Sequence, residues 1–291
     1  MPGATLTLRL LKALEGSYRP SGGEVYRLAE LAKLNKLYLA YLRRVGGPLE
    51  SELLREEARL RWFLRNAVEV VGALRGLDYA LYKFRRPVEH VSVDLDVLVS
   101  RSDVARAARA LVRRGFRVVV PEPYTVTLER RGFIVDLYTE PAFAWVVYMS
   151  GSGLLRDCVE EVELGGVGAR ALSREAEVAV AAAHAVYKEH LVLLLDCLVA
   201  WEWANGKARE VARELKVERA LEILLGVCEL VKGGAVEAPV KLGSRALLGA
   251  YLGKVAGDPA FRATLPSAVR YILSRGDAGA LVLRRLTRKS Y

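Results

Sequence analysis

The stretch VSVDLDVLVS, residues 91–100, places two aspartates inside a run of apolar and β-branched residues. Such a run is typical of a buried strand. Because side chains alternate between the two faces of a strand, Asp94, Asp96 and Leu98 are expected to share one face. The opposite face is then formed by Val93, Leu95, Val97 and Val99. Both carboxylates therefore lie on one face, roughly 6–7 Å apart at the backbone.

Two carboxylates at this separation repel each other and raise each other's pKa, so a positive partner is expected beside them. A divalent metal ion is one such partner, because Mg²⁺ prefers carboxylate oxygens together with substrate phosphates. The alternative is a strand end in solvent, where Asp94 and Asp96 are simply exposed. The D-x-D pattern alone leaves both interpretations open.

A third carboxylate follows in GFIVDLY, residues 132–138, where Asp136 is again flanked by apolar residues. If this strand is the neighbour of the first, Asp136 lies beside the other two aspartates. Three carboxylates on one sheet face can hold two Mg²⁺ ions about 3.5–4 Å apart. One ion would bind a triphosphate and the other would activate an attacking hydroxyl, with Asp136 helping to take its proton.

The elements around these strands predict a small mixed sheet. Strand-like composition recurs over residues 77–84, 91–99, 116–120, 124–130 and 132–138. Between the second and third of these, Val104, Ala107, Ala108, Leu111 and Val112 form the apolar stripe of an amphipathic helix. The fold class is therefore α+β: a small mixed sheet with flanking helices.

Helical periodicity dominates on both sides of this sheet. Residues 24–45 and 51–76 each read as a helical segment, and from Ser173, a candidate N-cap, a long helix or two in sequence are expected. We predict a helical N-terminal region (1–75), a sheet domain (76–172) and a helical C-terminal domain (173–291).

The amino-acid composition limits the class of protein to which this chain can belong. Hydrophobic residues make up 52% and charged residues 27% of 291 residues, which is enough for a real core and excludes a disordered chain. The net charge of +10 favours an anionic partner such as nucleotide or nucleic acid, although a generally basic proteome explains it equally well. No P-loop motif is present.

Cysteine usage and hydropathy suggest an intracellular location. Cys158, Cys197 and Cys228 form no CxxC pair, so neither a zinc site nor a disulfide framework is predicted. The first residues lack the apolar core of a signal peptide, and the most apolar run, residues 191–200, is too short to span a bilayer. We therefore expect a soluble, cytoplasmic protein with no membrane partner.

Three motifs together resemble the DNA polymerase β-like nucleotidyltransferase superfamily, in particular its minimal, uncharacterised bacterial and archaeal members. They are VDLDVLV, a helix ending in RRGF, and GFIVDLYTEP about forty residues after the aspartate pair. YALYKFRRP, with Lys83, is similar to the lysine-bearing strand that precedes D-x-D in these proteins. The resemblance covers roughly residues 76–204. It implies that Asp94 and Asp96 are metal ligands and Asp136 is the third carboxylate.

The chain departs from the superfamily at one place. A Gly-Ser turn that holds the triphosphate usually lies some ten residues before D-x-D, and here that place reads Tyr82-Lys83-Phe84. Lys83 can replace the hydroxyl as a phosphate contact. Arg85 and Arg86 are further candidates for binding the triphosphate, with a solvated loop as the alternative.

The resemblance extends into the C-terminal helices, where His184 and Asp196 match the family's histidine and Leu-Asp pair. His184 either contacts nucleotide or acceptor, or is a hydrogen-bonded packing histidine. Asp196 lies in an apolar helix and must find a partner there, which favours a structural role.

These observations predict a Mg²⁺-dependent nucleotidyltransferase that moves a nucleoside monophosphate from an NTP, such as ATP, to a hydroxyl and releases pyrophosphate. The positive charge slightly favours RNA, such as a tRNA end, as acceptor; a protein hydroxyl or a small molecule stays open. The alternative is a catalytically inactive relative that binds nucleotide or nucleic acid. The sequence does not indicate an oligomeric state.

Overall fold

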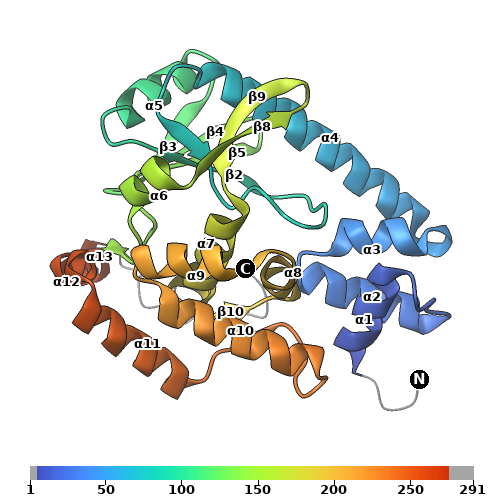
Figure 1. The fold of residues 1–291 in the computed structure, drawn as a ribbon. Coiled ribbons are helices and arrows are strands. Elements are labelled where there is room, and N and C mark those ends of the chain that lie inside the picture. The colour runs from blue at the N-terminus through green and yellow to red at the C-terminus, as the bar shows by residue number, and fades with distance from the viewer. Residues whose placement is uncertain (1–4, 275–291) are drawn as a thin grey trace.

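The computed structural model describes residues 5–274, and it combines a seven-stranded mixed sheet with helices on both of its faces (Figure 1). The sheet order is β3-β4-β5-β2-β1-β9-β8. Its strands are β1 (Tyr79–Leu81), β2 (Asp94–Val99), β3 (Arg117–Pro121), β4 (Thr125–Arg130), β5 (Phe133–Tyr138), β8 (Val159–Leu164) and β9 (Val167–Leu172). A short hairpin pairs β6 (Ala142–Phe143) with β7 (Val146–Val147), and a second two-stranded pair joins β10 (Leu191–Val192) to the distant β11 (Val240–Lys241). The predicted α+β fold is confirmed.

The helices fall into three groups along the chain. The N-terminal group is α1 (Leu6–Glu15), α2 (Gly23–Leu34), α3 (Tyr38–Val45), the 3₁₀ turn η1 (Gly47–Leu49) and α4 (Glu50–Ala73). The sheet carries α5 (Val104–Val112) and α6 (Gly151–Asp157). The C-terminal group is α7 (Arg174–His184), the π-helical turn η2 (Ala185–Glu189), α8 (Leu194–Trp203), α9 (Gly206–Glu214), α10 (Glu218–Lys232), α11 (Ser244–Gly257), α12 (Pro259–Thr264) and α13 (Pro266–Ser274).

The two faces of β2 pack against different helices, as the alternation of its side chains predicts. Leu95, Val97 and Val99 are buried with residues of α4 and α5. Leu98 points the other way and is buried with residues of α6 and α7. Asp94 and Asp96 therefore face the layer of the C-terminal helices, which lies below the sheet in Figure 1.

All five predicted strands form in this sheet, and a further hairpin joins them. The strands β8 and β9 pair antiparallel around Gly165 and Gly166, and β9 lies parallel to β1. Both glycines have positive φ, so the turn needs residues without a Cβ. This hairpin extends the sheet beyond the strands predicted from the sequence.

The helix predicted over residues 24–45 is wrong at one point, since the chain breaks between α2 and α3. The side chain of the buried Asn35 donates to the carbonyls of Leu31 (3.0 Å) and Ala238 (3.1 Å). Its Oδ1 accepts from the N–H of Leu194 at the start of α8 (2.8 Å). These bonds end α2, and Lys36 follows with a left-handed backbone, φ 58°.

The helical segment from residue 173 forms two helices in sequence, α7 and α8, rather than one long helix. This is the second of the two alternatives that the sequence predicts. The Ser173 hydroxyl accepts from the N–H of Ala176, which confirms the predicted N-cap of α7. After His184 the helix widens into η2, and His190 adopts a left-handed backbone before α8 begins. Single π-turns of this kind are frequent at functional sites.

Hydrophobic residues form two clusters. One joins α4 and α5 to one face of the sheet, and the other joins α1–α3, the opposite face and the C-terminal helices. The predicted limits at residues 75/76 and 172/173 stay a prediction. Among the described residues, no helix is both long and apolar enough to cross a membrane.

The expectation of no disulfide is wrong. Cys197 of α8 and Cys228 of α10 are fully buried and disulfide-bonded, 31 residues apart, while Cys158 is buried and free. The spacing of the cysteines does not predict this disulfide, because α8 and α10 are brought together only by tertiary packing.

This disulfide is expected to stabilise the helical layer by about 3–4 kcal/mol, the range for a loop of this length. Urea unfolding with dithiothreitol should therefore show a lower midpoint than unfolding without it. The double variant Cys197→Ala/Cys228→Ala should unfold at the same urea concentration in both conditions. An unchanged midpoint for the wild-type chain in reductant would contradict a stabilising bond.

Candidate active site

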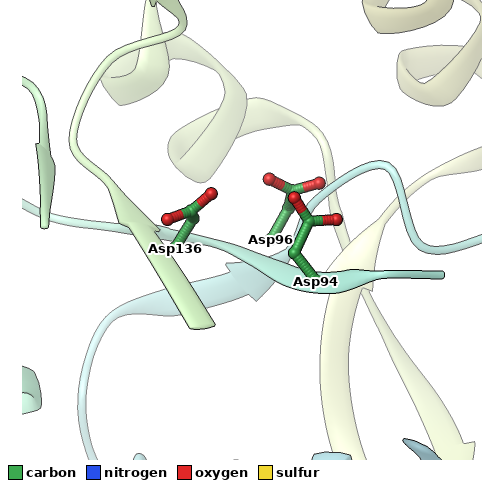
Figure 2. A group of neighbouring side chains, drawn as sticks. All are labelled: Asp94, Asp96 and Asp136. Atoms are coloured by element: carbon green, nitrogen blue, oxygen red, sulfur yellow. The ribbon is translucent and has the colours of Figure 1, made fainter. Parts of the chain in front are cut away.

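Three aspartates converge on the helix-covered face of the sheet. Asp94 and Asp96 lie on β2, and Asp136 lies on β5, its parallel neighbour. The register pairs the Cα atoms of Asp96 and Asp136, so both side chains point the same way. One oxygen of each carboxylate lies within 4.8 Å of the others, and Figure 2 shows all three on the same side of the strands. The predicted convergence is confirmed.

Each carboxylate is held by its own neighbours. Asp96 is 8% exposed, and its Oδ2 lies 2.9 Å from the ammonium of Lys83. Asp136 accepts hydrogen bonds from Thr127 on β4 and, at 3.5 Å, from the Tyr138 hydroxyl. The Asp94 carboxylate accepts from the Ser92 hydroxyl at 3.3 Å.

The pKa values of Asp136, Asp96 and Lys83 are shifted. Desolvation raises the pKa of Asp136 to about 6. The hydrogen bond from Thr127 lowers this pKa, and the neighbouring carboxylates raise it further. Burial also raises the pKa of Asp96, which the Lys83 ammonium opposes. Burial alone would lower the pKa of Lys83, but Asp96 and Asp94 outweigh it and raise that pKa. Lys83 therefore stays protonated beside the cluster.

The three carboxylates fit a divalent cation. Asp96 Oδ1 is buried and has no hydrogen-bond partner among residues 5–274. A buried acceptor without a donor is costly, and a hard cation would satisfy it. The donor set is entirely carboxylate oxygen, which suits Mg²⁺ or Mn²⁺ rather than a soft metal.

Two cavities meet at the aspartates. The first, here the apolar cavity, has about 310 Å³, close to the lower limit for small-molecule sites. It lies under Leu60, Phe63 and Leu64 of α4 and also contains Phe84 and Val88. The second, here the basic cavity, is lined by Lys36, Lys83, Arg86, His90, Ser92, Asp94, Asp96, Asp136, Tyr138, Ala181, His184, Lys188, Glu189, Leu195 and Asp196.

The three predicted nucleotide-binding residues lie in different places. Lys83 and Arg86 line both cavities. The side chain of Arg85 bonds Glu160 on β8 and the carbonyl of Leu172, and it lines neither cavity. Their role in binding nucleotide stays a prediction.

A buried glutamate organises the loop that carries these basic residues. Glu177 of α7 is completely buried, and its Oε1 accepts from the backbone N–H groups of Phe84 (2.9 Å) and Arg85 (3.3 Å). Its Oε2 pairs with the Arg86 guanidinium at 3.2 Å. These N–H groups lie where the resemblance expects a phosphate-binding turn. The signal for Glu177 was its charge within the apolar run REAEVAVAAAH.

The histidines and Asp196 also line this site. His184 is buried, and its Nε2 lies 3.3 Å from Glu189 Oε1. Burial, with Arg86 and Lys36, lowers the pKa of His90 to about 3, so its imidazole is neutral. Asp196 Oδ2 accepts from the N–H of Leu193 at the start of α8, a structural role.

Sequence reasoning missed Lys36 as a residue of this site. It enters the basic cavity from the turn after α2, and no local motif marks it. Burial lowers its pKa to about 8, helped by Lys83 and Arg86 and opposed by Asp94 and Asp196.

Carboxylates on adjacent parallel strands, with cationic side chains in the same cavity, suit an enzyme that transfers phosphate-bearing groups. A family model described as an uncharacterised nucleotidyltransferase matches residues 49–233, more than half of the chain. The chain belongs to this family and is a nucleotidyltransferase.

Solved structures with a similar arrangement include two of one enzyme. The crystal structure of ANT(2")-Ia with adenylyl-2"-tobramycin is 13% identical and covers 60% of this chain and 98% of that one, with a TM-score of 0.35. The solution structure of the antibiotic-resistance factor ANT(2'')-Ia is 14% identical and covers 59% and 94%, with a TM-score of 0.33. No curated protein matches the chain.

Proposed function

We propose that this protein transfers a nucleoside monophosphate from an NTP to a hydroxyl group and releases pyrophosphate. The observation that supports it most is the pairing of Asp96 with Asp136 on parallel neighbouring strands, with Asp94 two residues away. The motifs VDLDVLV and GFIVDLYTEP support placing the family in the DNA polymerase β-like superfamily, near its bacterial and archaeal members.

In this reaction the acceptor oxygen forms a bond to the α-phosphorus, and the bond from that phosphorus to the pyrophosphate oxygen breaks. Asp136 accepts the hydroxyl proton, and Lys83 and Arg86, which line both cavities, offset the negative charge of the phosphates. Asp94, Asp96 and Asp136 would hold two Mg²⁺ ions, which supply charge neutralisation and lower the pKa of the hydroxyl.

The acceptor we favour is RNA, such as a tRNA end, because the chain carries a net charge of +10. A protein hydroxyl is the second acceptor class to be tested. The predicted cytoplasmic location is compatible with both acceptors.

Transfer of label tests this function. The protein is incubated with Mg²⁺, each α-³²P-labelled NTP in turn, and total RNA or cell protein. We expect label in one acceptor fraction, its loss with EDTA, and its return when excess Mg²⁺ is added. Label that persists in EDTA would contradict a metal-dependent reaction.

One observation favours a second candidate, a catalytically inactive protein that binds nucleotide or nucleic acid. The Glu177 carboxylate bonds the backbone N–H groups of Phe84 and Arg85, where a triphosphate would be expected to bind. If NTP binds but no fraction acquires label with any nucleotide, this second function replaces the first.

A further inference from the structure

The basic cavity is built from three separate parts of the chain. The sheet and its loop provide the aspartates, Lys83 and Arg86, and the turn η2 provides Lys188. The turn between α2 and α3 provides Lys36, which lies outside residues 49–233, the span that the family model matches. The N-terminal helices therefore add a cation to a site that the family's own span leaves more acidic.

The position of Lys36 is fixed by its neighbours rather than by its own long side chain. Asn35 links the end of α2 to the start of α8 and to Ala238 through three hydrogen bonds. The N–H of Leu37 donates to the carbonyl of Ala32 at 2.8 Å, which closes the turn. The left-handed backbone of Lys36 lies between these two anchors, so the turn presents its side chain from a rigid frame.

Four acidic residues of the basic cavity have neighbours that fix their carboxylates. Asp96 pairs with Lys83, Asp136 accepts from Thr127, and Asp196 accepts from the N–H of Leu193. Glu189 lies against His184.

The cationic side chains of the basic cavity lie on different walls. Lys188 lies 5.8 Å from the centre of the Tyr138 ring, and its charge acts on Asp96. Lys36 is close enough to Asp94, Lys83 and Arg86 for their charges to act on it. A polyphosphate that reaches the aspartates through this cavity would meet Lys36 from the N-terminal helices and Lys188 from the C-terminal group. The apolar cavity, which shares Asp94 and Asp96 with the basic cavity, suits the nucleoside.

We infer that Lys36 binds the polyphosphate arm of the nucleoside triphosphate, so that the N-terminal helices complete the substrate site. The inference rests on the proposed function, because it assigns the triphosphate to the basic cavity. Lysine suits this role as a point charge that can contact either the β- or the γ-phosphate.

Calorimetric titration with Mg²⁺ and no acceptor tests it, using each NTP and the matching NMP as probes. Lys36→Met keeps the length of the side chain and removes its charge. We expect it to weaken NTP binding by about ten- to a hundred-fold, the range for one charge-assisted hydrogen bond, and to change NMP binding less than about twofold. Lys36→Arg should restore most of the NTP affinity.

Lys33→Met is the matched control, since Lys33 lies one turn earlier on α2, pairs with the exposed Glu30 and lines neither cavity. It should bind NTP as the wild-type chain does. Unchanged NTP affinity in Lys36→Met overturns the inference, as does equal weakening of NTP and NMP, which indicates a structural role. Weaker RNA binding with unchanged NTP binding also overturns it and assigns Lys36 to the acceptor.

The same titration separates this inference from the proposed reaction. If the wild-type chain binds NTP but transfers no label, the proposed reaction is contradicted. The comparison of NTP binding by the wild-type chain and Lys36→Met still decides the inference. A wild-type chain that transfers label while Lys36→Met binds NTP normally contradicts the inference alone. A wild-type chain that binds no NTP overturns both.

Discussion

The variant Asp136→Asn is expected to transfer nucleotide at least about a thousand-fold more slowly than the wild-type protein while keeping its fold. The amide retains an oxygen that can accept from Thr127 and has the same shape, so β4 and β5 stay paired. What is lost is one of three negative charges within 4.8 Å of one another. Metal-assisted stabilisation of a transferring phosphoryl group is worth several kcal/mol, and about 4 kcal/mol corresponds to about a thousand-fold in rate.

The rate is measured as label transferred per minute at saturating NTP, with circular dichroism to verify the fold. Asp78→Asn is the matched control, because Asp78 pairs with Arg170 beside the opposite end of β2. It should transfer nucleotide at the wild-type rate. An Asp136→Asn rate within tenfold of wild type would show that two aspartates suffice and that Asp136 is no part of the reaction.

The geometry of the aspartates could be predicted because it depends on local rules. Strand periodicity alone places Asp94 and Asp96 on one face, and the flanking apolar residues identify both β2 and β5 as buried strands. Their adjacency was an assumption at the sequence level. The parallel pairing of Asp96 with Asp136 confirms it.

The remainder of the site depends on contacts between distant segments, which periodicity does not describe. The turn at Lys36 has no glycine or proline, and its only sequence signal is Asn35, which also occurs within helices. It exists because Asn35 bonds α8 about 160 residues later. The disulfide between α8 and α10 and the pairing of β9 with β1 also join segments that are far apart in the sequence. Lys36 and Glu177 of the helical regions were therefore missed as residues of this site, although the strand aspartates and His184 were found.

The loop between β1 and β2 takes its conformation from a buried glutamate. The sequence has no Gly-Ser turn at Tyr82-Lys83-Phe84, and Lys83 adopts a left-handed backbone there, φ 54°. The Glu177 carboxylate binds the next two N–H groups and so holds this conformation. The loop thereby directs the Lys83 ammonium to Asp96. The stability of the loop and the electrostatics of the site thus depend on the same buried glutamate.

The variant Glu177→Leu is expected to lower the free energy of unfolding by about 3–5 kcal/mol, the usual cost of removing one partner of a buried ion pair. Leucine fills a similar volume, but it leaves the Arg86 guanidinium and the N–H groups of Phe84 and Arg85 without this acceptor. Glu177→Gln keeps an oxygen for the two N–H groups and loses only the charge. Its expected cost is therefore smaller, about 1.5–3 kcal/mol.

Urea unfolding followed by circular dichroism measures these differences, and label transfer by the folded variants reports on the loop. Glu175→Gln is the control on the same helix, because Glu175 is part-exposed and an amide oxygen can still accept its hydrogen bonds from Asn205 (3.5 Å), Ser173 and its own backbone N–H. Its unfolding free energy should stay within about 0.5 kcal/mol of wild type. We expect Glu177→Leu to transfer nucleotide more slowly even where it is fully folded, since Lys83 loses its fixed position. Wild-type stability in Glu177→Leu would mean that other contacts hold the loop, and the buried glutamate would then have no structural role.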